Sequence, residues 1–492
     1  MTVTSKIVNS AMFAASAKII SKVLGLFSTM VLARLLAPEQ FGLIAIVSIA
    51  LYFFDILSHT ASEQYIIQKS SVTKKELGTA WTANLVLKSL ICVLIVLSAP
   101  WVALFFERPV LTNAIRVSAL ILPLQALKSP IYILLKRQLK FAPLFWSSLA
   151  ERLFAVPLLI GLAIILQSYW AFIITDIVAG VLAVGISYFI AKRRPVFTVS
   201  GLAVQWTFSK WMLAKSIVGY ARSQIDTVVV SKAFSAAMLG NYHMARELAM
   251  MPAHFILGPA IDPLLSAFKN DKNNKAELLN NVAFTLIVVF LISIPLCAYL
   301  WAFSPEIVLV LLGKNWSEAG ALLSILSFLF LYWSMLHVVE TALIAQSKVR
   351  LIFYFDLFSL CFIAGSLIVG VNYSLNIYEL AWIRVVTGLL GSLILLVKLF
   401  EGYLKQLVSV VWIFLLIVIV SYIWGVLVSY QATCFANFPP WLEMFVSGLE
   451  LMIILTLALT ALWRVNTHYH IARLISIARI VLFKGMSTLN KK

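Results

Sequence analysis

Two stretches of sequence decide the fold of this chain: VLARLLAPEQFG at residues 31–42 and VVSKAFSAAMLG at residues 229–240. In each, an apolar run ends at one cation, turns through about seven small or polar residues and resumes after a glycine. Arg34 and Lys232, like the two final glycines, are separated by 198 residues. An interfacial anchor after an apolar run explains the cation but not the matched distance to the glycine, so the spacing predicts an internal repeat.

Outward from these copies, apolar stretches fill the chain, and each is long enough for the ~20 residues that a helix needs to cross a hydrocarbon core. Hydrophobic residues make up 62% of the sequence and charged residues only 12%, which is too little polar surface for a soluble protein of 492 residues. The sequence therefore predicts an all-α polytopic membrane protein with about 14 transmembrane helices. The predicted spans are residues 9–32, 41–60, 78–99, 111–135, 142–166, 169–191, 207–230, 241–267, 281–302, 320–345, 351–371, 377–397, 407–428 and 441–463.

The repeat places the two copies in the first and seventh spans, which cross the membrane in the same direction because six spans separate them. We therefore expect two six-helix lobes related by an axis near the membrane normal, followed by two extra C-terminal helices. The predicted divisions are an N-terminal lobe at 1–194, a cytoplasmic linker at 195–206, a second lobe at 207–400, two additional transmembrane helices at 401–463 and a basic amphipathic cytoplasmic tail at 464–492.

Lys and Arg residues set the expected orientation. Of the 38 in the chain, 23 lie in the two tails and the even-numbered gaps between spans, whereas the odd-numbered gaps hold only Arg34, Arg108, Lys232 and Lys314. The positive-inside rule then places both termini in the cytoplasm. The net charge of +18 is spread over loops that face anionic lipid, which disfavours a nucleic-acid partner.

Cations inside the spans indicate a functional cavity. Each charged side chain costs ~2.5 to 3.5 kcal/mol near the bilayer centre, so these groups must face protein or water. Lys18 and Lys22 share a face of the first span, and Lys215, Arg222 and Asp226 share a face of the seventh. We predict that the four cations bind an anionic substrate such as a diphosphate. Alternatively, ion pairs such as Arg222 with Asp226 only hold helices together.

Further polar side chains on the second and eighth spans are candidates for ion coupling, charge balance or sugar contacts, and the sequence does not rank these roles. They are Asp55, Glu63, His243, Glu247, His254 and Asp262, and Asp226 of the seventh span is a candidate for the same roles. No metal-ligand spacing and no phosphate-binding Gly-rich loop are present, so no cofactor is expected. The short outer gaps leave no room for a catalytic domain, so we expect a protein that is not an enzyme.

Several motifs resemble one known family. The stretch at residues 31–42, together with Leu239–Tyr242, Pro252, Pro259 and Leu312–Trp316, is similar to Wzx-type polysaccharide flippases of the multidrug, oligosaccharidyl-lipid and polysaccharide exporter superfamily, in their colanic-acid-exporter branch. The similarity covers about residues 6–397. Two departures are Ala37, where Gly is frequent, and Ser266, where Pro is frequent and bends the eighth helix.

The resemblance implies a flippase of the bacterial inner membrane. Its substrate would be undecaprenyl-diphosphate-linked oligosaccharide, moved by alternating access from the cytoplasmic to the periplasmic leaflet for exopolysaccharide, capsule or lipopolysaccharide synthesis. A periplasmic-side polymerase is a further expected partner. Two alternatives stay open: a cation-coupled antiporter of small molecules with the same fold, and a membrane-embedded transferase or ligase acting on a lipid-linked sugar.

Overall fold

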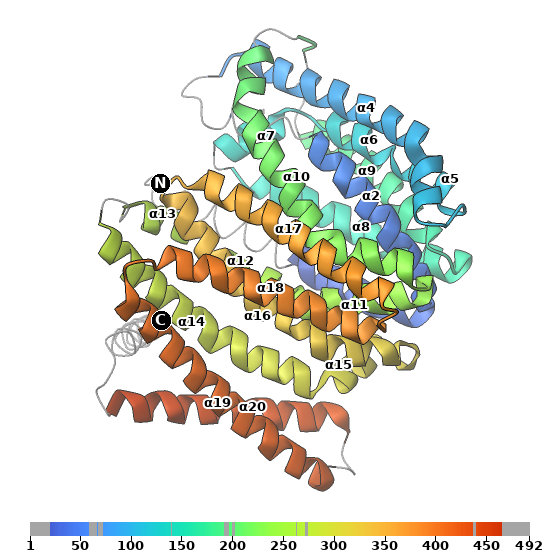
Figure 1. The fold of residues 1–492 in the computed structure, drawn as a ribbon. Coiled ribbons are helices and arrows are strands. Elements are labelled where there is room, and N and C mark those ends of the chain that lie inside the picture. The colour runs from blue at the N-terminus through green and yellow to red at the C-terminus, as the bar shows by residue number, and fades with distance from the viewer. Residues whose placement is uncertain are drawn as a thin grey trace, which may run out of the picture. The chain divides into compact units, whose positions relative to one another are not determined.

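The computed structural model describes residues 20–58, 66, 72–138, 140–190, 196–198, 202–261, 263–270, 274–435 and 439–464. Within these ranges every regular element is a helix (Figure 1). The helices form two compact units. Unit 1 comprises Met1–Met244, Leu311–Trp316 and Asp356–Ile377, and unit 2 comprises Ala245–Val310, Ser317–Phe355 and Tyr378–Lys492.

Unit 1 contains most helices of the N-terminal half. Helix α4 packs against α2, α5 and α6, while α8 packs along α9 and α10 along α2. The bounds are a helix over residues 20–35, α2 (Pro38–Leu57), α4 (Lys74–Phe105), α5 (Leu111–Ser118), α6 (Ile121–Leu127), α7 (Ile131–Arg137), α8 (Ala142–Leu166), α9 (Trp170–Ile190) and α10 (Leu202–Ala233), with the first part of α11 (Ala236–Pro252) and most of α17 (Val349–Asn372).

Unit 2 is built around α14, which packs against both α16 and α19. Its apolar core includes the rings of Phe290 on α14 and Phe414 on α19, whose centroids are 5.0 Å apart. Helices α19 and α20 cross one another in Figure 1 and are in contact. The bounds are a π-helical turn (Ala253–Leu257), α12 (Gly258–Ile261), α13 (Leu264–Asn270), α14 (Lys275–Ala302), α15 (Ser304–Leu311), α16 (Ser317–Ala345), α18 (Ile377–Leu399), α19 (Leu404–Phe435) and α20 (Pro440–Arg464).

Most apolar stretches of the sequence are helices long enough to cross a membrane. In the described part of the chain, 11 helices qualify as spans, or 12 if one bent pair is counted. The chain is thus a polytopic helical membrane protein, as predicted. The first and seventh predicted spans overlap the helix over residues 20–35 and α10, which do not meet that criterion. The total of fourteen spans stays a prediction.

The fourth span is not the single helix that its apolar run suggests. It breaks between α6 and α7, with a bend of 60° between the two parts. Pro130 lies at the break, where its ring and its missing N–H prevent a continuous helix. The freed backbone groups are satisfied inside unit 1: the Lys128 carbonyl accepts from the Trp81 indole at 3.1 Å, and the Ser129 amide donates to the Ser187 hydroxyl at 2.9 Å. Such pairing is what makes a broken span tolerable in a membrane.

The eighth span is also interrupted. Helix α11 ends at Pro252, a π-helical turn follows, and α12 begins at Gly258, whose amide donates to the Ala253 carbonyl. A proline inside the span removes one helix hydrogen bond, and the wider π turn accommodates the change. The π-helical turn is present although Ser266 replaces the proline frequent in the resembling branch.

The predicted lobes at 1–194 and 207–400 are defined by the repeat, whereas units 1 and 2 are defined by packing. The repeat-based division stays a prediction. Most of the tail predicted at 464–492 lies outside the described residues, as does part of the linker predicted at 195–206.

Candidate functional site

A buried ion pair joins two helices of unit 1. Arg222 on α10 places its Nε atom 3.3 Å from Oδ1 of Asp356 on α17. The Arg222 side chain is 19% exposed and the Asp356 side chain 3%. Two opposite charges in this setting stabilise each other, whereas either one alone would be an uncompensated charge inside a membrane protein. Sequence reasoning identified Arg222 but missed its partner, which lies 134 residues further along the chain.

Asp226 lies one helical turn beyond Arg222 on α10 and is only 1% exposed. Its Oδ2 atom accepts a hydrogen bond of 2.9 Å from the hydroxyl of Tyr242 on α11. Two members of the polar face predicted for the seventh span, Arg222 and Asp226, are thus directed into the protein. Arg222 connects α10 to α17, and Asp226 connects α10 to α11.

A second buried pair in unit 1 was not predicted. Lys88 on α4 is 8% exposed and its Nζ lies 2.8 Å from Oδ1 of Asp55 on α2 and 2.9 Å from Oε1 of Gln125 on α6. The Ser58 hydroxyl donates to the same Asp55 oxygen at 3.1 Å. Asp55 was a candidate for ion coupling, and the structure places it in a network that spans three helices. The sequence feature that could have indicated this pair is one acidic residue in the second span, Asp55, and one basic residue in the third, Lys88.

The remaining predicted cations are less enclosed. Lys22 is partly exposed on the helix over residues 20–35, and Lys215 is partly exposed on α10, where no described residue forms an ion pair with it. A Cβ added to Gly25, on the same face as Lys22, would meet no atom within 4 Å. Lys18 lies outside the described residues, so the convergence of the four cations stays a prediction.

The other candidates occupy different environments. His243 is partly exposed and Glu247 is exposed on α11, whereas His254 is exposed in the π-helical turn. Glu63 and Asp262 lie outside the described residues. Among the described residues, no group of three or more His, Cys, Asp or Glu side chains is placed to hold a metal ion.

The two copies of the repeat meet directly within unit 1. A Cβ added to Gly42 would lie 1.9 Å from the carbonyl oxygen of Ala236, and a Cβ added to Gly240 would lie 1.9 Å from that of Pro38. Ala236 follows Pro38 by the repeat distance of 198 residues, so the contact is reciprocal. Only glycine permits backbones to approach this closely, which explains why both copies carry one at this position.

Hydrogen bonds at the same end of unit 1 are exchanged between distant segments. The Trp316 indole, which is fully buried, donates to the carbonyl of Ala33 at 2.7 Å. Arg108 donates to the carbonyl of Phe234 at 3.3 Å. Each copy of the repeat therefore has the C-terminal end of its helix bound by a side chain from the other half of the sequence. All these residues lie in gaps that the positive-inside rule assigns to the outer side.

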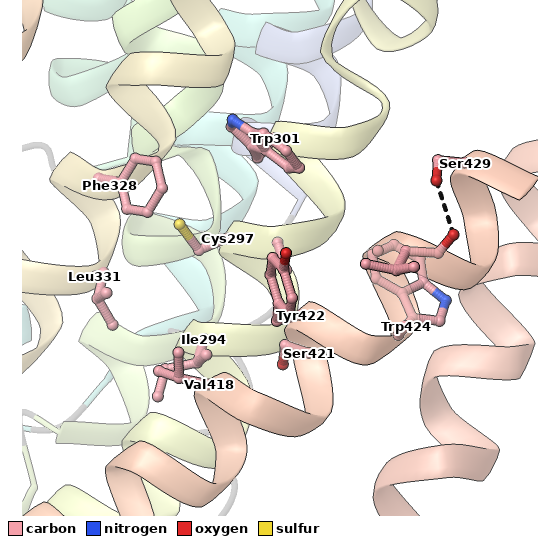
Figure 2. Close-up of a pocket in the computed structure, with 13 residues that line it drawn as sticks. Ile294, Cys297, Trp301, Phe328, Leu331, Val418, Ser421, Tyr422, Trp424 and Ser429 are labelled. Carbon is pink, nitrogen blue, oxygen red and sulfur yellow. Dashed lines mark hydrogen bonds between the residues drawn. The ribbon is translucent and has the colours of Figure 1, made fainter.

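An apolar cavity of about 520 Å³ lies in unit 2 between α14, α16 and α19 (Figure 2). Hydrocarbon and aromatic side chains form most of its lining, including Cys297, Phe328 and Val418. Trp301 and Tyr422, which are 53% and 73% exposed, border it, so the cavity is open at the surface of the unit. Its size and lining suit a hydrocarbon chain rather than a charged group.

The sequence and the fold of this chain are similar to those of known membrane transport and polysaccharide biosynthesis proteins. Over 379 residues the chain is 25% identical to the lipopolysaccharide biosynthesis protein WzxC of Escherichia coli (strain K12), covering 75% of this chain and 76% of WzxC. It is 23% identical to the succinoglycan biosynthesis transport protein ExoT of Rhizobium meliloti (strain 1021) over 300 residues, 60% of each chain. The fold is similar to that of the lipid II flippase MurJ in an inward closed conformation, with a TM-score of 0.73, 14% identity and coverage of 92% of this chain and 99% of that one.

The chain also matches the model of a protein family. Residues 31–321 match the family described as Polysaccharide biosynthesis protein, which is more than half of the 492 residues. The predicted resemblance to polysaccharide flippases is confirmed by this match and by the relatives. The chain therefore belongs to the family of polysaccharide biosynthesis proteins.

Proposed function

We propose that this protein moves an undecaprenyl-diphosphate-linked oligosaccharide from the cytoplasmic to the periplasmic leaflet of the bacterial inner membrane, for synthesis of a surface polysaccharide. The observation that carries the proposal is that a chain made almost wholly of membrane helices belongs to a polysaccharide biosynthesis family. A lipid-linked sugar that is made on the cytoplasmic leaflet must cross to the periplasmic leaflet before it can enter a surface polysaccharide. A bundle of membrane helices can provide a path for its polar headgroup.

Alternating access is the proposed mechanism. The lobes at 1–194 and 207–400, with cytoplasmic termini, rock about their common axis and expose a central cavity to each side in turn. The reciprocal contact of Gly42 and Gly240 supports this mechanism, because it joins the two copies at the predicted outer end. Separation of this contact opens the cavity toward the periplasm.

The diphosphate is proposed to bind the cations of the first and seventh helices, Lys18, Lys22, Lys215 and Arg222. Lys215 is partly exposed and its ammonium group has no ion-pair partner among the described residues. Arg222 lies on the same helix as Lys215, with its Nε atom 3.3 Å from Oδ1 of Asp356.

Net direction requires a further source of free energy, because a carrier alone only equilibrates its substrate. We propose either consumption of the product by a periplasmic-side polymerase or coupling to protons or sodium. Carboxylates in or next to the spans are the candidates for coupling, namely Asp55, Glu63, Asp226 and Asp262. His243, Glu247 and His254 are candidates for sugar contacts.

A strain lacking this protein tests the proposal. It should accumulate the lipid-linked oligosaccharide in the inner leaflet, where an impermeant periplasmic reagent cannot label it, and surface polysaccharide should disappear. Labelling equal to that of the parent strain would contradict the proposal. Expression of the Lys215→Ala variant should fail to restore export, whereas an antiporter of cationic drugs would be insensitive to loss of this positive charge.

A further inference from the structure

Unit 2 contains a group of aromatic side chains that the diphosphate site does not use. Trp333 and His337 on α16 are stacked, with ring centroids 4.8 Å apart and planes 16° apart. His254 in the π-helical turn meets Trp333 edge-on at 5.9 Å and 67°. These three residues are called the ring stack below.

The ring stack lies on the less covered face of a helix that is otherwise deeply buried. In the C-terminal half of α16, the partly exposed residues are Trp333, His337, Glu340 and Ile344, spaced by four, three and four positions. This spacing places them on one helical face. Residues on either side of the stripe, such as Val338 and Val339, are fully buried in the core.

This face carries polar groups within a membrane-spanning helix. Helix α16 lies in the candidate span Lys314–Ala345. Histidine and glutamate inside a span are expensive toward lipid and are expected toward protein or a water-filled space. His337 and Glu340 keep partial exposure after packing, so the face that they share with Trp333 is expected to border protein or water rather than lipid.

The interrupted eighth span positions the third ring. The π-helical turn Ala253–Leu257 carries His254 and contacts α16. A Cβ added to Gly258 at its end would lie 3.9 Å from Cη2 of Trp333, so the turn and the indole are in close approach. Interrupted membrane helices and π turns recur at transport and ligand sites, where they direct polar groups toward a bound molecule.

We propose that the ring stack is a saccharide subsite that binds a sugar ring of the lipid-linked oligosaccharide; the inference rests on the proposed function. The electron-rich faces and polar edges of aromatic rings suit the C–H groups and hydroxyls of a pyranose. The indole nitrogen of Trp333 donates no hydrogen bond within the described part of the chain.

Leaflet exchange in liposomes tests the inference with two probes, the native lipid-linked oligosaccharide and undecaprenyl diphosphate without sugar. Trp333→Ala should slow exchange of the oligosaccharide lipid up to about tenfold, from the ~0.5 to 1.5 kcal/mol of an aromatic contact. Exchange of the sugar-free lipid should stay within about twofold of wild type, because that lipid has no sugar ring to contact the indole. Equal slowing of both probes, or of neither, would overturn the subsite. Trp412→Ala is the matched control, since that side chain is 54% exposed on α19.

A measurement on the unmodified protein covers the case in which the variant does not fold. Carbethoxylation of His254 and His337, mapped by mass spectrometry, should slow when the free oligosaccharide is added and not when inorganic diphosphate is added. An unchanged rate with the oligosaccharide would reject the subsite. If wild-type protein exchanges neither lipid, the proposed function fails, and the protection experiment still decides whether the ring stack binds sugar.

Discussion

Replacing Arg222 by Ala removes the cation that faces Asp356 across α10 and α17. The Asp356 side chain is 3% exposed, and its Oδ1 atom lies 3.3 Å from Nε of Arg222. Loss of one partner from a buried pair leaves an uncompensated charge and typically costs about 3 to 5 kcal/mol. With the Arg222 side chain only 19% exposed, solvent screens little of this interaction, so the full range applies.

The second partner supplies the internal control. Asp356→Ala should destabilise the protein by a similar amount, because it leaves the guanidinium buried. The double variant should be more stable than the sum of the single losses predicts, by about 0.5 to 3 kcal/mol, as for residues in direct contact. Lys215→Ala removes a cation from the same helix without breaking an ion pair among described residues, so its stability should stay within about 0.5 kcal/mol of wild type.

Unfolding of the purified variants in detergent micelles measures these differences, and restoration of surface polysaccharide in a deletion strain measures export. A double variant that recovers stability but not export assigns Arg222 a direct contact with substrate. Recovery of both would make the pair a helix connector only. Strictly additive losses in the single and double variants would refute the reasoning that the two charges stabilise each other.

Three further changes are expected to have defined effects. Gly42→Ala should destabilise the protein by about 1 to 3 kcal/mol in the same unfolding assay, because the new methyl group would lie 1.9 Å from a carbonyl oxygen, whereas Gly365→Ala meets no atom within 4 Å and should not. Gly425→Trp should fill the apolar cavity and slow leaflet exchange if a lipid chain occupies it, while Gly365→Trp should leave the rate unchanged. The hydrogen bond with Lys398 and the charge of that residue lower the pKa of Glu401 below its ordinary 4.5. Lys398→Gln should therefore raise the pKa of Glu401 toward 4.5 in an NMR titration. In the wild type, the hydrogen bond should persist above pH 4.5 and be lost as the pH falls through the lowered pKa.

The helical architecture was predictable because each apolar stretch must satisfy its backbone internally in a membrane, and a helix does so locally. The repeat was readable from Arg34, Lys232 and their matched glycines. The structure adds the reason for the glycines, since Gly42 and Gly240 allow the backbones of the two copies to come into contact. That contact joins residues about 198 positions apart, so it could not be predicted from any local sequence pattern.

The partners of buried charges were not predictable for the same reason. Spacing along one helix shows which residues share a face, but Asp356 reaches Arg222 from a helix more than a hundred residues away. Lys88 and Asp55 likewise pair between α4 and α2. Residues 111–135 were predicted as one span, so the break at Pro130 was missed, and the hydrogen bond from Trp81 that caps it follows only from packing.

Leaflet exchange in liposomes that contain only this protein and its lipid-linked oligosaccharide tests the central claim most directly. The substrate is the lipid that a deletion strain accumulates. The account predicts that the protein speeds equilibration between leaflets and that Lys215→Ala slows it. An exchange rate equal to that of protein-free liposomes would contradict translocation by this chain and would instead favour an enzyme acting on the same lipid.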